Sequence, residues 1–167
     1  GFALTSYFIN NGFFQVQEII LEGIRGEMAV TGNMTVSKAF SVILKNNLGV
    51  FTMTFFVSFF ISGGMAFVVI WNASIVGVLI GNLSSHVAQI PVKLLPYVVH
   101  GTFETGAYVL AGFSGYLFSY HLEHLLKHET HSEGSFMVVA EDGTSLLILG
   151  VLMIVFAAML ETGYPLV

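Results

Sequence analysis

The sequence predicts an all-α protein, a polytopic transmembrane helical bundle with amphipathic interfacial helices, and two observations support this fold class. Hydrophobic residues make up 55% of the 167 residues and charged residues only 9%, whereas soluble domains carry about 25% charged residues. Apolar runs long enough to cross a bilayer alternate with polar stretches that show helical periodicity. We therefore expect a multi-pass protein of the cell membrane whose first partner is the lipid bilayer.

The charged and sulfur-containing residues exclude several other classes of protein. Five Lys and Arg residues against ten Asp and Glu residues give a net charge of −5, which provides no basic surface for nucleic acid. The chain has no Cys, so it contains no disulfide, thiolate metal site or cysteine nucleophile.

Residues 1–14 and 15–47 are predicted to differ in their relation to the membrane. The apolar run 1–14 is shorter than the roughly 20 residues of a transmembrane helix, so we expect it to be the end of a first transmembrane helix. Residues 15–47 are more polar and are predicted to form two amphipathic interfacial helices separated at Gly32-Asn33. The apolar positions of the second helix recur with the helical period at Val36, Ala39, Phe40, Ile43 and Leu44.

Residues 48–120 form the predicted membrane core, which opens with an uncharged run from Leu48 to Leu83. A straight helix of these 36 residues would measure about 54 Å, well beyond a hydrocarbon core of about 30 Å. The run must therefore bend, and Gly63-Gly64 marks the place. It forms either one kinked, Gly-broken helix or a hairpin of two helices. A further crossing is predicted from Tyr97 to Tyr120.

The rest of the chain is predicted to form a histidine-rich polar connector at 121–142 and a last transmembrane helix at 143–167. A kink and a hairpin at Gly63-Gly64 each leave four of the five Lys and Arg residues on one side of the membrane. The positive-inside rule therefore does not discriminate between these two topologies.

Two rows of small residues at four-residue spacing are predicted to be helix-packing faces. Small side chains let helix backbones approach closely inside a membrane, and the first row contains a GxxxG step. We expect these faces to support assembly as a homo-oligomer or as a subunit of a larger membrane complex. The rows consist of Ala73, Gly77 and Gly81, and of Ala107, Ala111 and Gly115.

The strongest candidates for a functional site are His100 and Glu104, two ionisable side chains in an otherwise apolar segment. Their four-residue spacing places them on one helix face, and ionisable groups at bilayer depth normally have a partner or face an aqueous cavity. They form either a structural polar pair, joined to Asn72 or to Asn46 and Asn47, or part of a path for protons or ions that includes Asn72.

A hydrolytic zinc site at His100 and Glu104 is a third alternative. A catalytic zinc ion uses three protein ligands and an open position for water. The sequence around this pair provides no third ligand and no His-Glu-x-x-His signature. A role without catalysis is therefore favoured, and enzymatic function stays open.

The connector carries four histidines at steps of three, four and three residues, which would place their imidazoles on one helix face. Such a set can bind zinc or copper. The alternatives are an ordinary solvated face beside acidic residues and a pH sensor. The four are His121, His124, His128 and His131.

Five motifs occur in a fixed order between about Val42 and Tyr116. They are Leu44-Lys45-Asn46-Asn47, Gly63-Gly64, Ile70-Trp71-Asn72-Ala73-Ser74-Ile75-Val76-Gly77, His100-Gly101-Thr102-Phe103-Glu104 and Ala111-Gly112-Phe113-Ser114-Gly115. In order and spacing these motifs resemble the stage II sporulation protein M family. The chain departs from the family pattern at Val99, where a proline usually precedes the histidine.

The resemblance implies a polytopic membrane protein that acts as a scaffold, similar to an anchor for a complex with cell-wall hydrolases. It marks His100, Gly101, Glu104, Asn72 and Asn46 as family positions, which does not establish them as catalytic residues. We therefore predict a membrane scaffold, or a subunit of a membrane or envelope complex, that assembles through its small-residue faces. The alternative is an ion or proton channel or transporter that uses His100 and Glu104.

Overall fold

The computed structural model describes residue 19, residues 36–126 and residues 133–163, and its long elements are all helices. They are α3 (Val36–Phe60), α4 (Gly64–Leu83), α5 (Ile90–Leu126) and α6 (Glu133–Gly163), with the short 3₁₀ helix η1 (Val87–Gln89) before α5. The described residues contain no strand. The all-α prediction is therefore confirmed.

Three of the described helices are long and apolar enough to cross a membrane. These segments are Val36–Phe60, Gly64–Asn82 and Met137–Gly163. Helix α5, which includes the predicted crossing from Tyr97 to Tyr120, is not among them. Its apolar stretch is interrupted by His100 and Glu104 and by several glycines and tyrosines, which lower its mean hydropathy.

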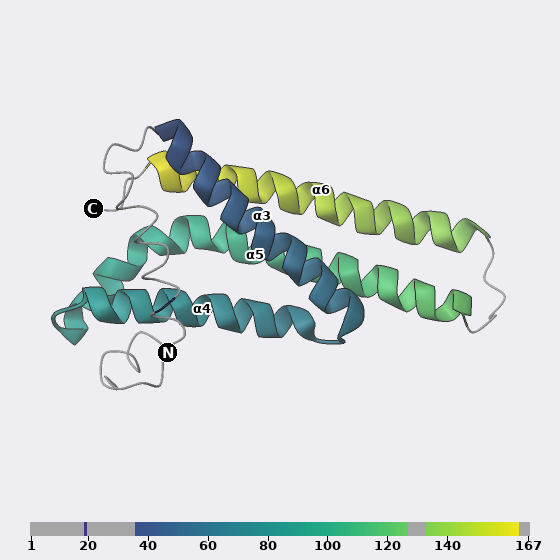
Figure 1. Cartoon of the computed structure of the whole chain (residues 1–167), viewed down its shortest axis with the longest axis horizontal. Helices are drawn as coiled ribbons and strands as arrows, with labels where there is room; N and C mark the ends of the chain where they lie inside the picture. Colours follow the sequence, from purple (N-terminus) through teal and green to yellow (C-terminus); the bar gives the residue numbers. More distant parts are fainter. Residues whose placement is uncertain (1–18, 20–35, 127–132, 164–167) are drawn as a thin grey trace.

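The four long helices run alternately in opposite directions and form one bundle (Figure 1). Helices α3 and α5 each contact all three other long helices, and α4 and α6 lie on opposite sides of this inner pair. Because its neighbours cover much of its surface, α5 can carry polar side chains that would be costly to expose to lipid.

The uncharged run forms a helical hairpin, which decides between the two predicted alternatives. Helix α3 ends at Phe60, and Gly63 adopts the left-handed conformation with φ of 82°. A side chain strongly disfavours this backbone conformation, so glycine suits the position. A Cβ atom on Gly64 would lie 2.7 Å from the carbonyl oxygen of Val57. The two glycines therefore serve different purposes, one conformational and one steric.

Three predicted segment boundaries fall inside helices. Helix α3 runs without a break across residues 47 and 48, so residues 36–47 are not a separate interfacial helix. Helix α5 continues to Leu126, and α6 begins at Glu133, ten residues before the predicted last span. A change from apolar to polar composition does not end a helix, because polar side chains on a helix that leaves the bilayer face water. The prediction for residues 1–14 and most of 15–35 lies outside the described residues.

The centre of the bundle consists of small residues on α5 packed against larger residues on α3 and α6. Ala107 and Ala111 are fully buried together with Phe51 of α3 and Ile154 of α6. A Cβ atom on Gly115 would overlap the backbone carbonyl oxygen of Phe55. The small side chains therefore allow the backbones of α3 and α5 to approach closely.

Candidate functional site

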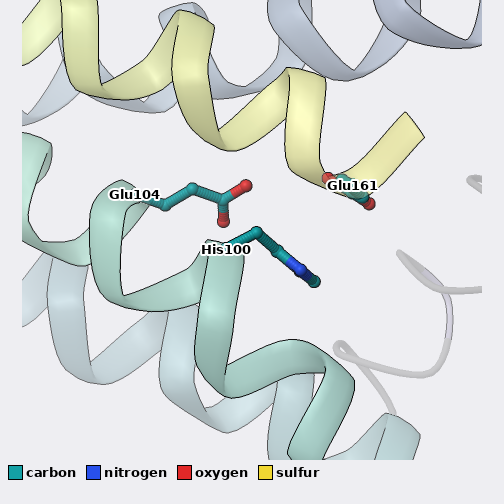
Figure 2. A group of neighbouring side chains, drawn as sticks. All are labelled: His100, Glu104 and Glu161. Atoms are coloured by element: carbon teal, nitrogen blue, oxygen red, sulfur yellow. The ribbon is translucent and has the colours of Figure 1, made fainter. Parts of the chain in front are cut away.

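The candidate site lies between α5 and the end of α6. His100 and Glu104 lie one turn apart on α5, and the antiparallel α6 brings Glu161 next to them (Figure 2). One imidazole nitrogen and one oxygen from each carboxylate lie within 4.8 Å of one another. The structure thus brings together the two ionisable residues singled out in the sequence and adds a third.

Sequence reasoning missed Glu161, although a signal was present. It is the only charged residue in the predicted last span, 143–167. An ionisable residue in such a segment is by itself a candidate for function. Because Glu161 lies near the end of its helix, where charged residues are common, that signal alone did not connect it to Glu104.

Asn47 of α3 closes the third side of the site. Its amide Nδ2 donates a hydrogen bond of 2.6 Å to Oε1 of Glu104, and only 5% of the Asn47 side chain is exposed. Asn46 is exposed and donates to Oδ1 of Asn47 over 3.2 Å. Asn47 is therefore the member of the Asn-Asn pair that contacts Glu104, and Asn46 contacts Asn47 from the exposed side.

Aromatic side chains surround the remaining surface. The rings of Tyr97 and His100 lie 5.7 Å apart between centroids, and His100 is 8% exposed. Tyr108, one turn after Glu104, is 3% exposed and lies within electrostatic range of both Glu104 and Glu161. The two carboxylates are themselves half-buried next to these side chains, where the effective dielectric constant is below that of water.

His100 is the basic side chain closest to the two carboxylates in the described part of the chain, and no Lys or Arg residue there pairs with them. Two ionised carboxylates within 4.8 Å would repel by about 3 kcal/mol or more at an effective dielectric constant of about 20. A proton, on a carboxyl group or on His100, or a bound cation would relieve this repulsion.

Asn72 makes a hydrogen bond within its own helix. It lies on α4, is half-buried, and donates its amide to the carbonyl oxygen of Val68 on its own helix over 3.1 Å. This bond satisfies the donor locally. It does not join Asn72 to His100 or Glu104, and a role for Asn72 beside them stays a prediction.

The two predicted packing faces are buried by the chain's own helices to different extents. Ala107, Ala111 and Gly115 pack against the chain's own α3 and α6, so this face of α5 is not available to a second subunit. On α4, Gly77 and Gly81 are buried and Ala73 is exposed.

Two of the four connector histidines, His121 and His124, lie at the other end of α5, away from the site. His121 is buried, and the ring of His124 lies 4.2 Å from that of Tyr120 between centroids. His128 and His131 lie outside the described residues. His121 also contributes to an apolar groove of about 450 Å³ between α3, α5 and α6. Its lining consists of Phe55, Phe59, Phe118, His121, Leu122, Leu125 and Leu147.

The chain matches a known protein family. The family model described as stage II sporulation protein M matches residues 2–164, which extends the resemblance from the motif region to nearly the whole chain, including the histidine-rich segment. No curated protein and no solved structure matches the chain.

Proposed function

Because the chain belongs to the stage II sporulation protein M family, we propose that it is a non-enzymatic integral membrane subunit that supports a larger complex of the cell membrane or envelope. The three helices able to cross a bilayer are consistent with a membrane location. In this role, the polar residues of the bundle hold its helices in place.

The hydrogen bond between Asn47 and Glu104 is the observation that carries this proposal. It joins α3 to α5 across 57 residues of sequence, and Glu161 brings α6 to the same point. Buried polar contacts of this kind make one arrangement of helices more stable than its alternatives. A scaffold needs such a fixed arrangement.

The outer surface of the bundle leaves room for lipid and for partner subunits. Only 17%, 39% and 28% of the most apolar windows of α3, α4 and α6 are buried within the chain. Because the small-residue face of α5 is occupied internally, assembly with other chains would use this outward surface, chiefly that of α4 and α6.

Replacing Glu104 with Gln tests the proposal. Gln keeps the size of Glu and can still accept the hydrogen bond from Asn47. We expect Glu104→Gln to leave the subunit composition unchanged, as measured by native mass spectrometry of protein in nanodiscs. Glu141→Gln, an exposed change on α6, is the matched control. Dissociation of the complex in both variants would show a general loss of folding and not a role for Glu104.

A second candidate is an ion or proton channel or transporter, and the pair of Glu104 and Glu161 favours it. Carboxylates inside membrane segments commonly mark ion and proton paths. In proteoliposomes, a transporter would show a proton-linked flux that Glu104→Gln abolishes and Glu141→Gln preserves. Flux that depends on Glu104 would overturn the scaffold proposal. Flux that is the same in Glu104→Gln and Glu141→Gln as in the wild-type chain would exclude an ion path through Glu104.

A further inference from the structure

We propose that His100, Glu104 and Glu161 bind a divalent transition-metal ion of the zinc class between α5 and α6. Their three donor atoms come from two helices and lie within 4.8 Å of one another (Figure 2). The metal would link α5 to α6 and, through Asn47, to α3. This inference goes beyond the assembly role and does not depend on it.

The donor set suits zinc in both chemistry and dimensions. Zinc binds imidazole nitrogen and carboxylate oxygen at about 2.0–2.2 Å, so tetrahedral donors lie about 3.3 Å apart. The three donors would therefore need to approach one another by at most about 1.5 Å, which rotation of flexible Glu side chains provides. Calcium and magnesium favour all-oxygen ligand sets, whereas imidazole favours zinc and its neighbours. Three protein ligands leave a fourth position for water.

Charge balance is an independent reason to expect a cation. Glu104 and Glu161 face each other without a Lys or Arg partner among the residues that the structure describes. Buried charges in proteins are paired or coordinate metals. A divalent cation would neutralise both carboxylates at once and would turn their repulsion into attraction toward a common centre.

The residues around the three ligands match the supporting shell of a metal site. Ligating carboxylates normally accept hydrogen bonds that fix their orientation, and Asn47 donates such a bond to Glu104. Tyr108 is 3% exposed, and its hydroxyl forms no hydrogen bond with the described residues. Tyr108 lies one turn after Glu104 on α5, so the two side chains share a helix face.

The position of Glu161 provides a route for the ion. Glu161 is only partly buried and lies two residues before the end of α6 at Gly163. Of the three ligands, His100 is buried and the two carboxylates are half-buried, so the carboxylates are the more accessible ligands to an arriving ion.

Zinc binding to the purified full chain tests this proposal. Protein in detergent is stripped with a chelator and dialysed against zinc, and bound metal is counted by mass spectrometry. We expect the wild-type chain to bind about one zinc ion at this site. Glu161→Gln and His100→Gln should each lose this ion, because either change removes one of three ligands. Glu141→Gln, exposed on the same helix as Glu161, should retain the full amount.

The connector histidines require a separate control, since they can bind zinc as well. In a chain carrying His121→Gln, His124→Gln, His128→Gln and His131→Gln, the zinc assigned to the new site should remain and should still require Glu161. The proposal would be overturned if the connector changes abolished zinc binding while Glu161→Gln left it unchanged. A wild-type chain that binds no zinc would also overturn it.

Two further measurements remain informative if a ligand variant folds poorly. Cobalt added to the wild-type chain should produce the visible absorption of a four- or five-coordinate site with nitrogen and oxygen ligands, and its absence would count against the site. Asn47→Ala, which leaves all three ligands in place, should weaken zinc affinity by about 10–100-fold. Unchanged zinc affinity in this variant would contradict the supporting role of Asn47.

Discussion

At the scale of single residues, Asn47 connects two helices through its side chain. It lies on α3, donates to Glu104 on α5, and accepts from Asn46 beside it. Loss of its amide would leave a largely buried carboxyl group without its hydrogen-bond donor. Leaving such a group unsatisfied costs more than the bond itself contributes, because the group has already lost its water.

Replacing Asn47 with Ala should therefore lower the free energy of unfolding by about 1–3 kcal/mol. Denaturant unfolding of the protein in detergent measures this change. Asn46→Ala is the matched control, because Asn46 is exposed and does not contact Glu104, and it should have a smaller effect. Equal losses in the two variants would contradict the assignment of Asn47 as the partner of Glu104.

The residues of the site were only partly predictable from the sequence. His100 and Glu104 stand out because ionisable groups are rare in apolar segments, and their helical spacing places them on one face. Asn47 was one of several partners that the sequence allowed, whereas Glu161 was not named, and each lies 57 residues away from Glu104 in sequence. Their proximity depends on how three helices cross, and periodicity within one helix carries no information about that.

At the scale of elements, the turn between α3 and α4 shows what a Gly-Gly pair can and cannot indicate. Two adjacent glycines in an apolar run are compatible with a kink and with a reversal, so the sequence left both open. The left-handed conformation of Gly63 and the close contact of Gly64 with Val57 are properties of the folded backbone. These two properties show that the chain reverses at Gly63-Gly64 and forms a hairpin.

Gly63→Ala should destabilise the hairpin by about 1–2 kcal/mol, because a Cβ atom disfavours a left-handed backbone conformation. The midpoint of thermal unfolding in detergent measures the effect. Gly49→Ala in α3 is the control, since no atom lies near its Cβ position and alanine favours helix by about 0.5–1 kcal/mol. A Gly63→Ala variant as stable as Gly49→Ala would show that the turn does not need glycine at this position.

Helix ends were the least predictable part of the fold. The sequence placed boundaries where polarity changes, yet α3, α5 and α6 continue through those positions. Propensity and hydrogen bonding continue a helix regardless of what its side chains face, so a boundary between lipid and water need not coincide with a helix end. The fold class was easier to predict, because composition alone distinguishes a membrane chain from a soluble one.

At the scale of the whole molecule, the bundle has two chemically different ends. The cluster of His100, Glu104 and Glu161 lies toward the end where α6 finishes, and the apolar groove that includes His121 lies toward the other. Between them, small residues of α5 pack against α3 and α6. Most of the remaining helix surface faces outward.

The outward surface should contact lipid, and the absence of Cys in the chain makes this easy to test. Leu152 and Ile154 lie on the same helix, but 61% of Leu152 is exposed and Ile154 is fully buried. In membranes, a nitroxide spin label attached at Leu152→Cys should collide with dissolved oxygen, which partitions into lipid, much more often than a label at Ile154→Cys. Equal oxygen accessibility at the two sites would mean that α6 does not pack as described, whereas low accessibility at both would indicate a partner subunit over Leu152.

The hairpin at Gly63 also fixes the sidedness of the molecule. Because four helices alternate in direction, the start of α3, the link from α4 through η1 to α5, and the end of α6 lie at one end of the bundle (Figure 1). The turn at Gly63 and the link from α5 to α6 lie at the other. If the bundle is upright in a bilayer, Val36 and Gly163 face the same compartment, and that compartment is the one from which Glu161 is reached.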